Sequence, residues 1–334
     1  MRYLFKYSIY LLMLISIQAV GQQLPQFSQY FQNPYLINPA ASSLYNDIDI
    51  NVGIRQQWSG FDGAPLTYYA GGTVRLRSAN RRRRINFSSR ISRHGQLCQR
   101  KNRPRMVKKP KHIVGGLVMI DKLGFFSRNS IMGSYAYHHP ISNKYYIAGA
   151  LSMGWYGFNF NSSDVVAVDA IDNTYSDFIG NGSQSNLFDI NAGILVYGDE
   201  FILGYSVYQI GQNQLRSDKR GVESSFSNAS LKMHHYLTGS YNFGVSDIID
   251  LTPSILLQFI DTAPLSFDLN LRAEYKKSIW IGISHRNEEG VVLSAGGVWD
   301  GWLKFGYAYD VSTSRVSNIS SGSNEIVLGL LLNR

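Results

Sequence analysis

One stretch of the sequence decides the fold, and it runs Leu265-Ser266-Phe267-Asp268-Leu269-Asn270-Leu271-Arg272-Ala273-Glu274-Tyr275. Apolar and polar side chains alternate along it without exception, which is the period of a β-strand whose two faces meet different surroundings. A soluble two-sheet protein would bury the apolar face in a core. A membrane barrel would turn the apolar face to lipid and the polar face to its lumen. The period alone leaves both alternatives open.

The same alternation recurs along the chain and predicts fourteen strands. The expected strands are 47–55, 66–76, 113–121, 130–138, 145–160, 187–197, 201–208, 235–243, 251–260, 265–275, 279–285, 291–299, 303–310 and 325–332. Most are close to the length of about nine to eleven residues with which a tilted strand crosses a bilayer. An even number of such strands predicts an all-β fold, an antiparallel transmembrane β-barrel of about 14 strands, because closure leaves no exposed edge.

The beginning of the chain has the pattern of a secretory signal peptide. Residues 1–21 carry early charges at Arg2 and Lys6, then a mostly apolar run, and then the small residues of Ala19-Val20-Gly21. The apolar run is short for the alternative, an uncleaved membrane anchor. No later stretch of about 20 apolar residues predicts a transmembrane helix. An exported chain of this kind is periplasmic, secreted or an outer-membrane barrel, and strand length favours the barrel.

These observations predict the organisation of the chain. A signal peptide at 1–21 precedes an irregular segment at 22–46, rich in Gln, Asn, Pro and aromatic residues, which is either periplasmic or plugs the lumen. The barrel follows at 47–334 with a basic insert at 77–112. The chain contains one cysteine, so no internal disulfide is expected.

Composition agrees with a barrel and locates the charge. Only 16% of residues are charged, whereas Gly (31), Tyr (22) and Phe (17) are abundant, which suits strands and interfacial aromatic belts better than a helical enzyme. Fifteen of the 32 basic residues lie from Arg75 to Lys111, where there is no Asp or Glu. The rest of the chain has 17 basic and 23 acidic residues. The net charge of +9 therefore belongs to one segment.

Connection lengths indicate the orientation. If the first strand rises from the periplasm, the connections after even-numbered strands face the periplasm and should be short. Five of them are: 140–144, 198–200, 244–249, 276–278 and 300–302. The long connections 161–186, 209–234 and 311–324 fall on the outer side. The basic insert is the exception, because it follows the second strand and should face the periplasm, where it could touch acidic partners or anionic lipid headgroups or remain a solvated loop.

No set of residues predicts catalysis, a cofactor or a metal. His138-His139 and His234-His235 are adjacent pairs, and neighbouring strand residues point to opposite faces, so neither pair can chelate from one side. Asp268 and Glu274 share a face but are separated by roughly 20 Å of strand, which is too far for a catalytic carboxylate pair. We interpret them as residues that solvate the lumen. A barrel hydrolase would be the enzymatic alternative, but no hydrolase motif supports it.

Several short blocks of the sequence resemble the PorP/SprF family of outer-membrane proteins, which is associated with type IX secretion and gliding motility. The blocks are 25–30, with Asn33-Pro34 and Asn38-Pro39-Ala40 after it, 55–65, 263–270, 306–310 and 322–326. The chain departs from the family at two points. The family usually has a short turn in place of the insert, and outer-membrane strands commonly end on an aromatic residue, whereas this chain ends Leu332-Asn333-Arg334.

The resemblance implies a non-enzymatic barrel that needs no cofactor and works by protein–protein contacts. Its partners would be type IX secretion components, such as the periplasmic ring lipoprotein, or the C-terminal domains of secreted cargo proteins of the adhesin or gliding type, within outer-membrane lipid and without nucleic acid. A passive or substrate-specific channel is the rival interpretation, because the lumen face is polar. Candidate partner-binding residues, which could instead only shape a plug and a turn, are Tyr30, Asn33, Pro34, Asn38, Trp58, Phe61, Asp62 and Pro65.

Overall fold

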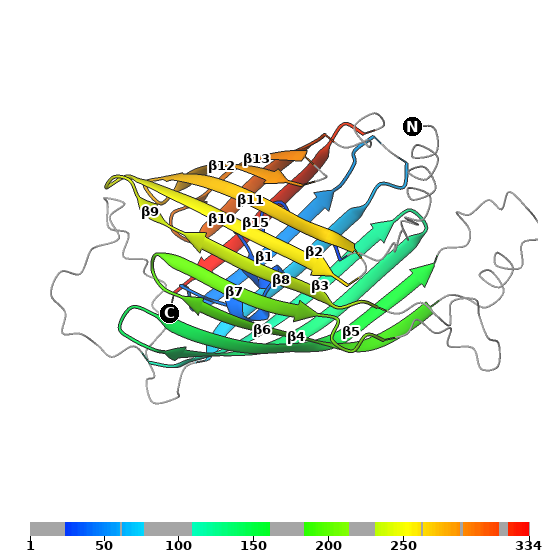
Figure 1. Ribbon diagram of the computed structural model, residues 1–334, viewed down its shortest axis with the longest axis horizontal. Coiled ribbons are helices and arrows are strands. Elements are labelled where there is room, and N and C mark those ends of the chain that lie inside the picture. The colour runs from blue at the N-terminus through cyan, green and yellow to red at the C-terminus, as the bar shows by residue number, and fades with distance from the viewer. Residues whose placement is uncertain are drawn as a thin grey trace, which may run out of the picture.

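The strands of the computed structural model form one antiparallel sheet that closes into a barrel (Figure 1). The structure describes residues 24–60, 62–76, 109–160, 184–213, 231–261, 263–287, 290–313 and 320–333. Consecutive strands pair as neighbours, β15 pairs with β1, and the pairing of β10 with β11 completes the ring. The predicted all-β barrel is confirmed.

The strand boundaries agree with the sequence-based expectation to within a few residues. The strands are β1 (Ile48–Gln56), β2 (Leu66–Leu76), β3 (Lys111–Leu123), β4 (Phe126–Pro140), β5 (Tyr146–Phe160), β6 (Gln184–Tyr197), β7 (Phe201–Tyr208), β8 (His234–Tyr241), β9 (Phe243–Gly244), β10 (Ile249–Ile260), β11 (Ala263–Tyr275), β12 (Ile279–Arg286), β13 (Gly290–Trp299), β14 (Leu303–Ser312) and β15 (Ser323–Leu332). Strands β8 and β9 pair with the same side of β10 and are two parts of one strand, so the fifteen segments make a fourteen-stranded barrel.

The interruption between β8 and β9 has a local cause. Asn242 lies outside the ladder, and Pro253 of β10 lies opposite the break and has no N–H to donate. On the other side, the N–H of Asn242 donates to the carbonyl of Glu200 at 2.6 Å, which continues the pairing with β7. Proline in the middle of a ladder therefore divides one strand into two without opening the barrel.

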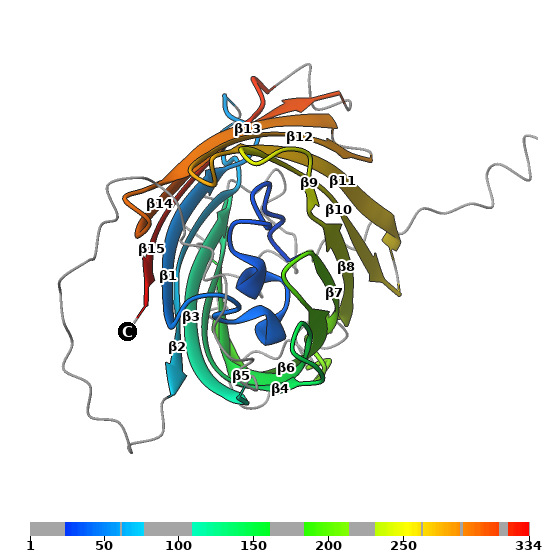
Figure 2. The ribbon, with the colours of Figure 1, turned by 90° about the vertical axis from the view of Figure 1, so that its left-hand side faces the viewer.

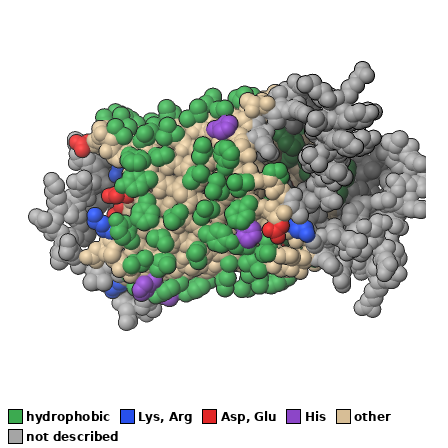
Figure 3. Space-filling model, in the orientation of Figure 1, with side chains coloured by type: hydrophobic (Ala, Val, Ile, Leu, Met, Phe, Trp, Pro, Cys, Tyr) green, Lys and Arg blue, Asp and Glu red, His purple; other side chains and the backbone are tan. Residues whose placement is uncertain are grey.

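The two faces of the wall are segregated as the alternation predicts. On β11, Leu269 is 47% exposed on the outside, whereas the neighbouring Asp268 is 3% exposed on the inside. Hydrophobic side chains cover the outer wall, and charged side chains gather towards its two ends (Figure 3). A soluble two-sheet protein would bury the face that is exposed here, so this alternative is wrong and the apolar band meets lipid. Among the described residues, no helix is long and apolar enough to cross a bilayer.

The two ends of the barrel differ in their connections: at one end the strands are joined by the long connections 161–183, 209–233 and 313–322 together with the short turns 124–125, 261–262 and 287–289, whereas the other end has short turns except for the basic insert. The start of β1, the end of β15 and the short turns 141–145, 198–200, 245–248, 276–278 and 300–302 lie at this second end. Short turns mark the periplasmic end of outer-membrane barrels. The ends of β2 and β3 that flank the basic insert lie there too, while residues 77–108 of the insert lie outside the described part of the chain. We call the opposite end the outer mouth.

Residues 24–46, which we call the lumenal segment, lie inside the barrel (Figure 2). The segment contains two short 3-10 helices, η1 (Pro34–Leu36) and η2 (Pro39–Ala41). Each begins at a proline, and the Asn38 side chain caps η2 by accepting from the N–H of Ala40 at 2.9 Å. Apolar side chains of the segment pack against the inner wall in three clusters, so it fills the lumen as a core would.

Replacing Leu269 by Arg should destabilise the barrel by about 2 to 4 kcal/mol, because a cation would face lipid near the middle of the membrane. Arg at Leu265, nearer the outer mouth on the same face, should cost only about 0 to 1 kcal/mol. Denaturant unfolding in phospholipid vesicles measures both values. Equal effects at the two positions would contradict a lipid-facing wall.

Candidate functional site

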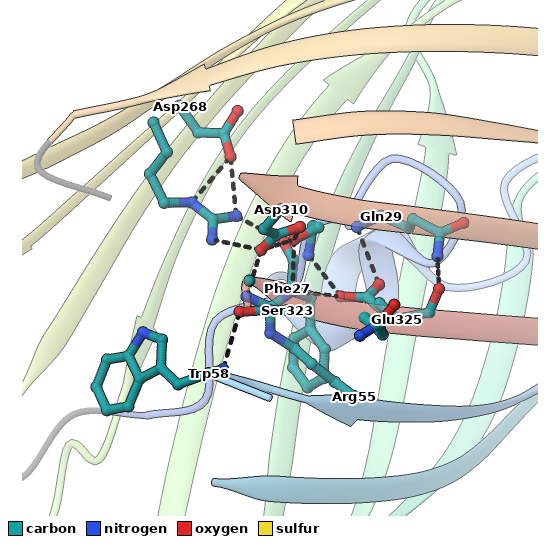
Figure 4. A network of polar contacts seen from close by, with 12 residues as sticks. Phe27, Gln29, Arg55, Trp58, Asp268, Asp310, Ser323 and Glu325 are labelled. Atoms are coloured by element: carbon teal, nitrogen blue, oxygen red, sulfur yellow. Dashed lines mark hydrogen bonds and ion pairs between the residues drawn. The ribbon is translucent and has the colours of Figure 1, made fainter. Parts of the chain in front are cut away.

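A buried cluster of charges joins the lumenal segment to the wall near the outer mouth (Figure 4). The guanidinium of Arg55, on β1, lies between two carboxylates of neighbouring strands. Its Nη2 is 2.7 Å from Asp310 Oδ2 on β14, and its Nη1 is 3.1 Å from Glu325 Oε2 on β15. Arg55 is 2% exposed, so these pairs are shielded from water.

The lumenal segment supplies the remaining donors. The backbone N–H groups of Ser28 and Gln29 donate to the two carboxylate oxygens of Glu325, at 2.7 and 3.0 Å. The Ser28 hydroxyl donates to Asp310 at 2.8 Å, and the Gln29 side chain donates to the backbone carbonyl of Glu325 at 3.1 Å. Hydrogen bonds to charged groups are among the stronger ones in proteins, so this is the firmest attachment of the segment that we find.

A second ion pair extends the cluster along the wall. Arg286, on β12, holds the Asp268 carboxylate at 3.0 Å, donates to the backbone carbonyl of Phe27 at 3.2 Å and approaches Asp310 to within 3.9 Å. Asp268 is therefore buried and paired, and our interpretation of it as a solvating residue is wrong. Its strand position predicted the face correctly but could not predict the partner.

The arrangement is electrostatically balanced only when the segment is present. Two guanidinium groups, of Arg55 and Arg286, face three carboxylates, and the excess negative charge is met by N–H and O–H donors from residues 28 and 29. A buried carboxylate that lacks donors costs several kcal/mol. The cluster is suited to holding two parts of the chain together, and the groups described here offer no activated nucleophile.

Two features of β14 bring the wall close to the segment. Lys304 Nζ donates to the backbone carbonyl of Gln32 at 2.8 Å and lies 3.4 Å from Asp49. At Gly306, a Cβ atom would lie 2.1 Å from Gln32 Nε2 and 2.2 Å from Gln29 Oε1. Only a residue without a side chain leaves room for both amides, so the glycine forms part of the seat for the segment.

The four candidate residues of the lumenal segment hold it in place. Tyr30 and Asn33 are buried, and the Tyr30 hydroxyl lies 3.3 Å from that of Ser254. Pro34 opens η1, and Asn38, also buried, donates from its side chain to the carbonyl of Ile194 at 3.1 Å besides capping η2. Tyr30, Asn33 and Asn38 therefore offer no surface to another protein while the segment stays in the lumen, Pro34 is half-buried, and the role of all four in partner binding remains a prediction.

The candidate residues of the first outer turn lie at the outer mouth. Asp62 is exposed, Trp58 and Pro65 are half-buried, and Phe61 falls outside the described residues. Trp58 has a φ of +53°, which is uncommon for a bulky residue. Its backbone N–H donates to the Ser323 hydroxyl at 3.1 Å. The carbonyl of Pro65 accepts from the N–H of Gln57 at 2.9 Å.

Both sides of this turn are fastened to its neighbours. The N–H of Ser59 donates to Gly322 at 2.7 Å, and the N–H of Gly124 donates to Gly63 at 2.9 Å. The structure therefore does not bring the two groups of candidate residues together. One group lies in the lumen, and the other lies at the outer mouth. Ser323 lies between the turn and the buried charge cluster: its hydroxyl accepts from the backbone N–H of Trp58, and Glu325 is two residues further along β15.

Reasoning from the sequence did not select the charged residues of the cluster, yet it contained a signal for them. Phe27 to Gln29, Arg55, Asp268, Asp310 and Glu325 each come from a different one of the five blocks that carry the family resemblance, whereas Arg286 lies outside all of them. The blocks are far apart in sequence and meet in this one place. Convergence of the blocks makes the junction between segment and wall the candidate site.

Comparison with known proteins identifies a family. The family model described as type IX secretion system membrane protein PorP/SprF matches residues 19–330. No curated protein matches the sequence.

Three solved structures show the extent of the structural likeness. The toluene transporter TbuX of Ralstonia pickettii is 10% identical over 89% of this chain and 92% of its own, with a TM-score of 0.47. The monoaromatic hydrocarbon channel CymD is 8% identical over 95% and 96%, with a TM-score of 0.49. The translocator domain of the autotransporter NalP from Neisseria meningitidis is 9% identical over 92% and 95%, with a TM-score of 0.41. Similarity at this level says nothing about what the lumen of this protein carries.

Replacing Arg55 by Met should destabilise the protein by about 3 to 5 kcal/mol, because the carboxylates of Asp310 and Glu325 would lose their shared cation while remaining buried. Denaturant unfolding in vesicles gives the free energy, and hydrogen exchange at residues 26–33 shows whether the segment loosens. Arg128→Met is the matched control. Arg128 pairs with Asp121 of the neighbouring strand at 3.4 Å, and Asp121 also accepts from the Thr67 hydroxyl at 2.7 Å, so loss of Arg128 should cost less than loss of Arg55 and leave the segment in place. A tight segment in Arg55→Met would show that the cluster does not hold it.

Proposed function

This chain belongs to the PorP/SprF family of type IX secretion system membrane proteins, and we propose that it acts in the export or surface anchoring of cargo proteins. It is an integral barrel of the outer membrane. Its role is that of a non-enzymatic component that works through protein–protein contacts, with periplasmic ring lipoprotein or cargo C-terminal domains of the adhesin or gliding type as partners.

One observation carries this proposal beyond the family: the lumenal segment occupies the barrel and is fastened to the wall by the buried charges. A cavity beside it, lined among others by Tyr30, Asn270 and Arg272, has a volume of about 90 Å³. Such a space has room for a few water molecules. A cargo chain could not pass through a lumen filled in this way, which supports a role in which partners bind at the ends of the barrel.

The outer turn at residues 57–65 supplies a suitable contact surface. Its hydrogen bonds to Gly322 and Gly124 fix the backbone on both sides, so an exposed residue such as Asp62 is presented in one position. A partner that binds a fixed loop does not have to order it first, and affinity gains from that preorganisation. We therefore keep Trp58, Phe61, Asp62 and Pro65 as the proposed outer contact, and Tyr30, Asn33, Pro34 and Asn38 as candidates for partner binding by the lumenal segment.

A passive or substrate-specific channel is the second candidate function. The polar inner face and the cavity beside Arg272 favour it, because they give water and small solutes a polar surface inside the barrel. The two functions predict different results in cells and in purified membranes.

Cells that lack this protein should retain a subset of surface proteins in the periplasm. The proposed role requires those cargo proteins to be exported or attached with its help, whereas a passive channel would leave their location unchanged. Mass spectrometry of periplasmic and surface fractions measures the distribution. Restoring the wild-type chain should restore it, and a normal distribution in the deletion strain would contradict the proposal.

The purified protein should show no large, steady conductance in planar bilayers, because the segment fills the lumen. Single-channel recording of the wild type, beside Arg55→Met, separates the two candidate functions. Brief or increased conductance only in Arg55→Met is the expected result, since that variant loosens the segment. A stable open channel in the wild type would favour solute transport.

A further inference from the structure

The two ends of the lumenal segment contact opposite ends of the barrel. At its beginning, the N–H of Leu24 donates to His234 Nε2, at 3.4 Å, on the first residue of β8. Ser28 and Gln29 bind Glu325, near the first residue of β15. Both strands start at the outer mouth, so the amino end of the segment lies there.

The middle of the segment lies deeper. The Tyr35 hydroxyl is 2.6 Å from that of Ser134, halfway along β4. Asn38 binds the carbonyl of Ile194 on β6, which is closer to the short-turn end of that strand.

The last residues of the segment reach the periplasmic end. The Ser43 hydroxyl lies 2.7 Å from that of Thr73 on β2, and Lys111, the first residue of β3, donates from its Nζ to the carbonyl of Leu44 at 2.9 Å. The Tyr45 hydroxyl donates at 3.1 Å to the carbonyl of Gly198, in a short turn.

Between these ends the path is not a straight descent: Gln32 is bound by Lys304, the second residue of β14 at the short-turn end, whereas the carbonyl of Leu36 accepts from Tyr208 at the outer end of β7. The two ends of the segment nevertheless lie at opposite ends of the barrel.

We propose that the lumenal segment is a transmembrane element of fixed direction whose amino end is presented at the cell surface and whose carboxyl end is held at the periplasmic face. The assignment of the two faces follows from the short turns, and an apolar band of roughly 25 Å separates them. The segment is long enough to cross that distance even with two 3-10 turns.

This topology has consequences for assembly and for contact with partners. If the expected signal peptide is removed on the periplasmic side, the amino end has to cross the lumen during assembly, either before the barrel closes around it or by threading through. Once the barrel is closed, residues 24–26 form a contact point at the outer mouth that belongs to the same continuous segment as the periplasmic residues 43–46. A protein bound at the outer mouth could then touch an element that is also anchored on the other side.

Cysteine labelling of intact cells tests the direction. The single natural cysteine is first removed by Cys98→Ser. One variant then carries a Cys-Gly-Ser insertion directly before Leu24, and the matched variant carries Tyr45→Cys at the opposite end, where the side chain is 57% exposed. The reagent is a maleimide on a polyethylene glycol chain too large to cross the outer membrane.

Intact cells should label the insertion before Leu24 and leave Tyr45→Cys unlabelled, and both should label after the outer membrane is permeabilised. Heat-dependent migration in gels confirms that each variant is a folded barrel. Protection of the amino-end cysteine in intact cells, or labelling of Tyr45→Cys, would overturn the proposal. Neither outcome depends on whether the protein acts in secretion, so this test and the secretion test can fail separately.

Discussion

The structure depends on the guanidinium of Arg55, which is almost completely shielded from water. Arg55 lies in the lumen between Glu325 and Asp310, and taking each such charge out of water costs several kcal/mol unless partners replace the lost solvation. The wall alone does not supply enough of them, because Asp268 adds a third carboxylate to the two guanidinium groups. The donors of Ser28 and Gln29 complete the set. The buried charges of the wall therefore need the donors of the segment, and the segment needs the wall to hold it in the lumen.

The close approach of the segment also explains why two positions of the inner wall are glycines. Gly306 leaves space for the amides of Gln29 and Gln32, and a Cβ at Gly193 would lie 2.1 Å from Asn38 Oδ1. Both glycines lie within strands, where glycine is unfavourable for the strand itself. Their cost is offset because the segment can approach the sheet closely. The polar face of the wall is thus shaped for one occupant, which is a different design from a lumen lined for passing solutes.

Most of the barrel was predictable because the alternation of apolar and polar residues reveals both where a strand runs and which side chains face lipid or lumen. The position of residues 24–46 was not, because their partners are remote: Ser28 and Glu325 are 297 positions apart. A single sequence gives no distance information at that separation, so Asp268 was assigned to solvent, and Arg55 was not selected at all. The interruption at Asn242 could have been predicted from Pro253. The family blocks held part of the remaining signal, since all residues of the cluster except Arg286 lie in five short stretches.

The ends of β2 and β3 that flank the basic insert lie where the lumenal segment joins the wall. Arg75 and Lys111 stand close to either side of the basic insert, and both hold the base of the segment: Arg75 pairs with Asp47 at 2.9 Å, and Lys111 donates to the carbonyl of Leu44 at 2.9 Å. An insertion between two residues that clamp the same four-residue stretch, 44–47, can add charge at the periplasmic face while the clamp keeps its geometry. The barrel and its segment can therefore remain as the family resemblance implies, while the surface offered to periplasmic partners changes.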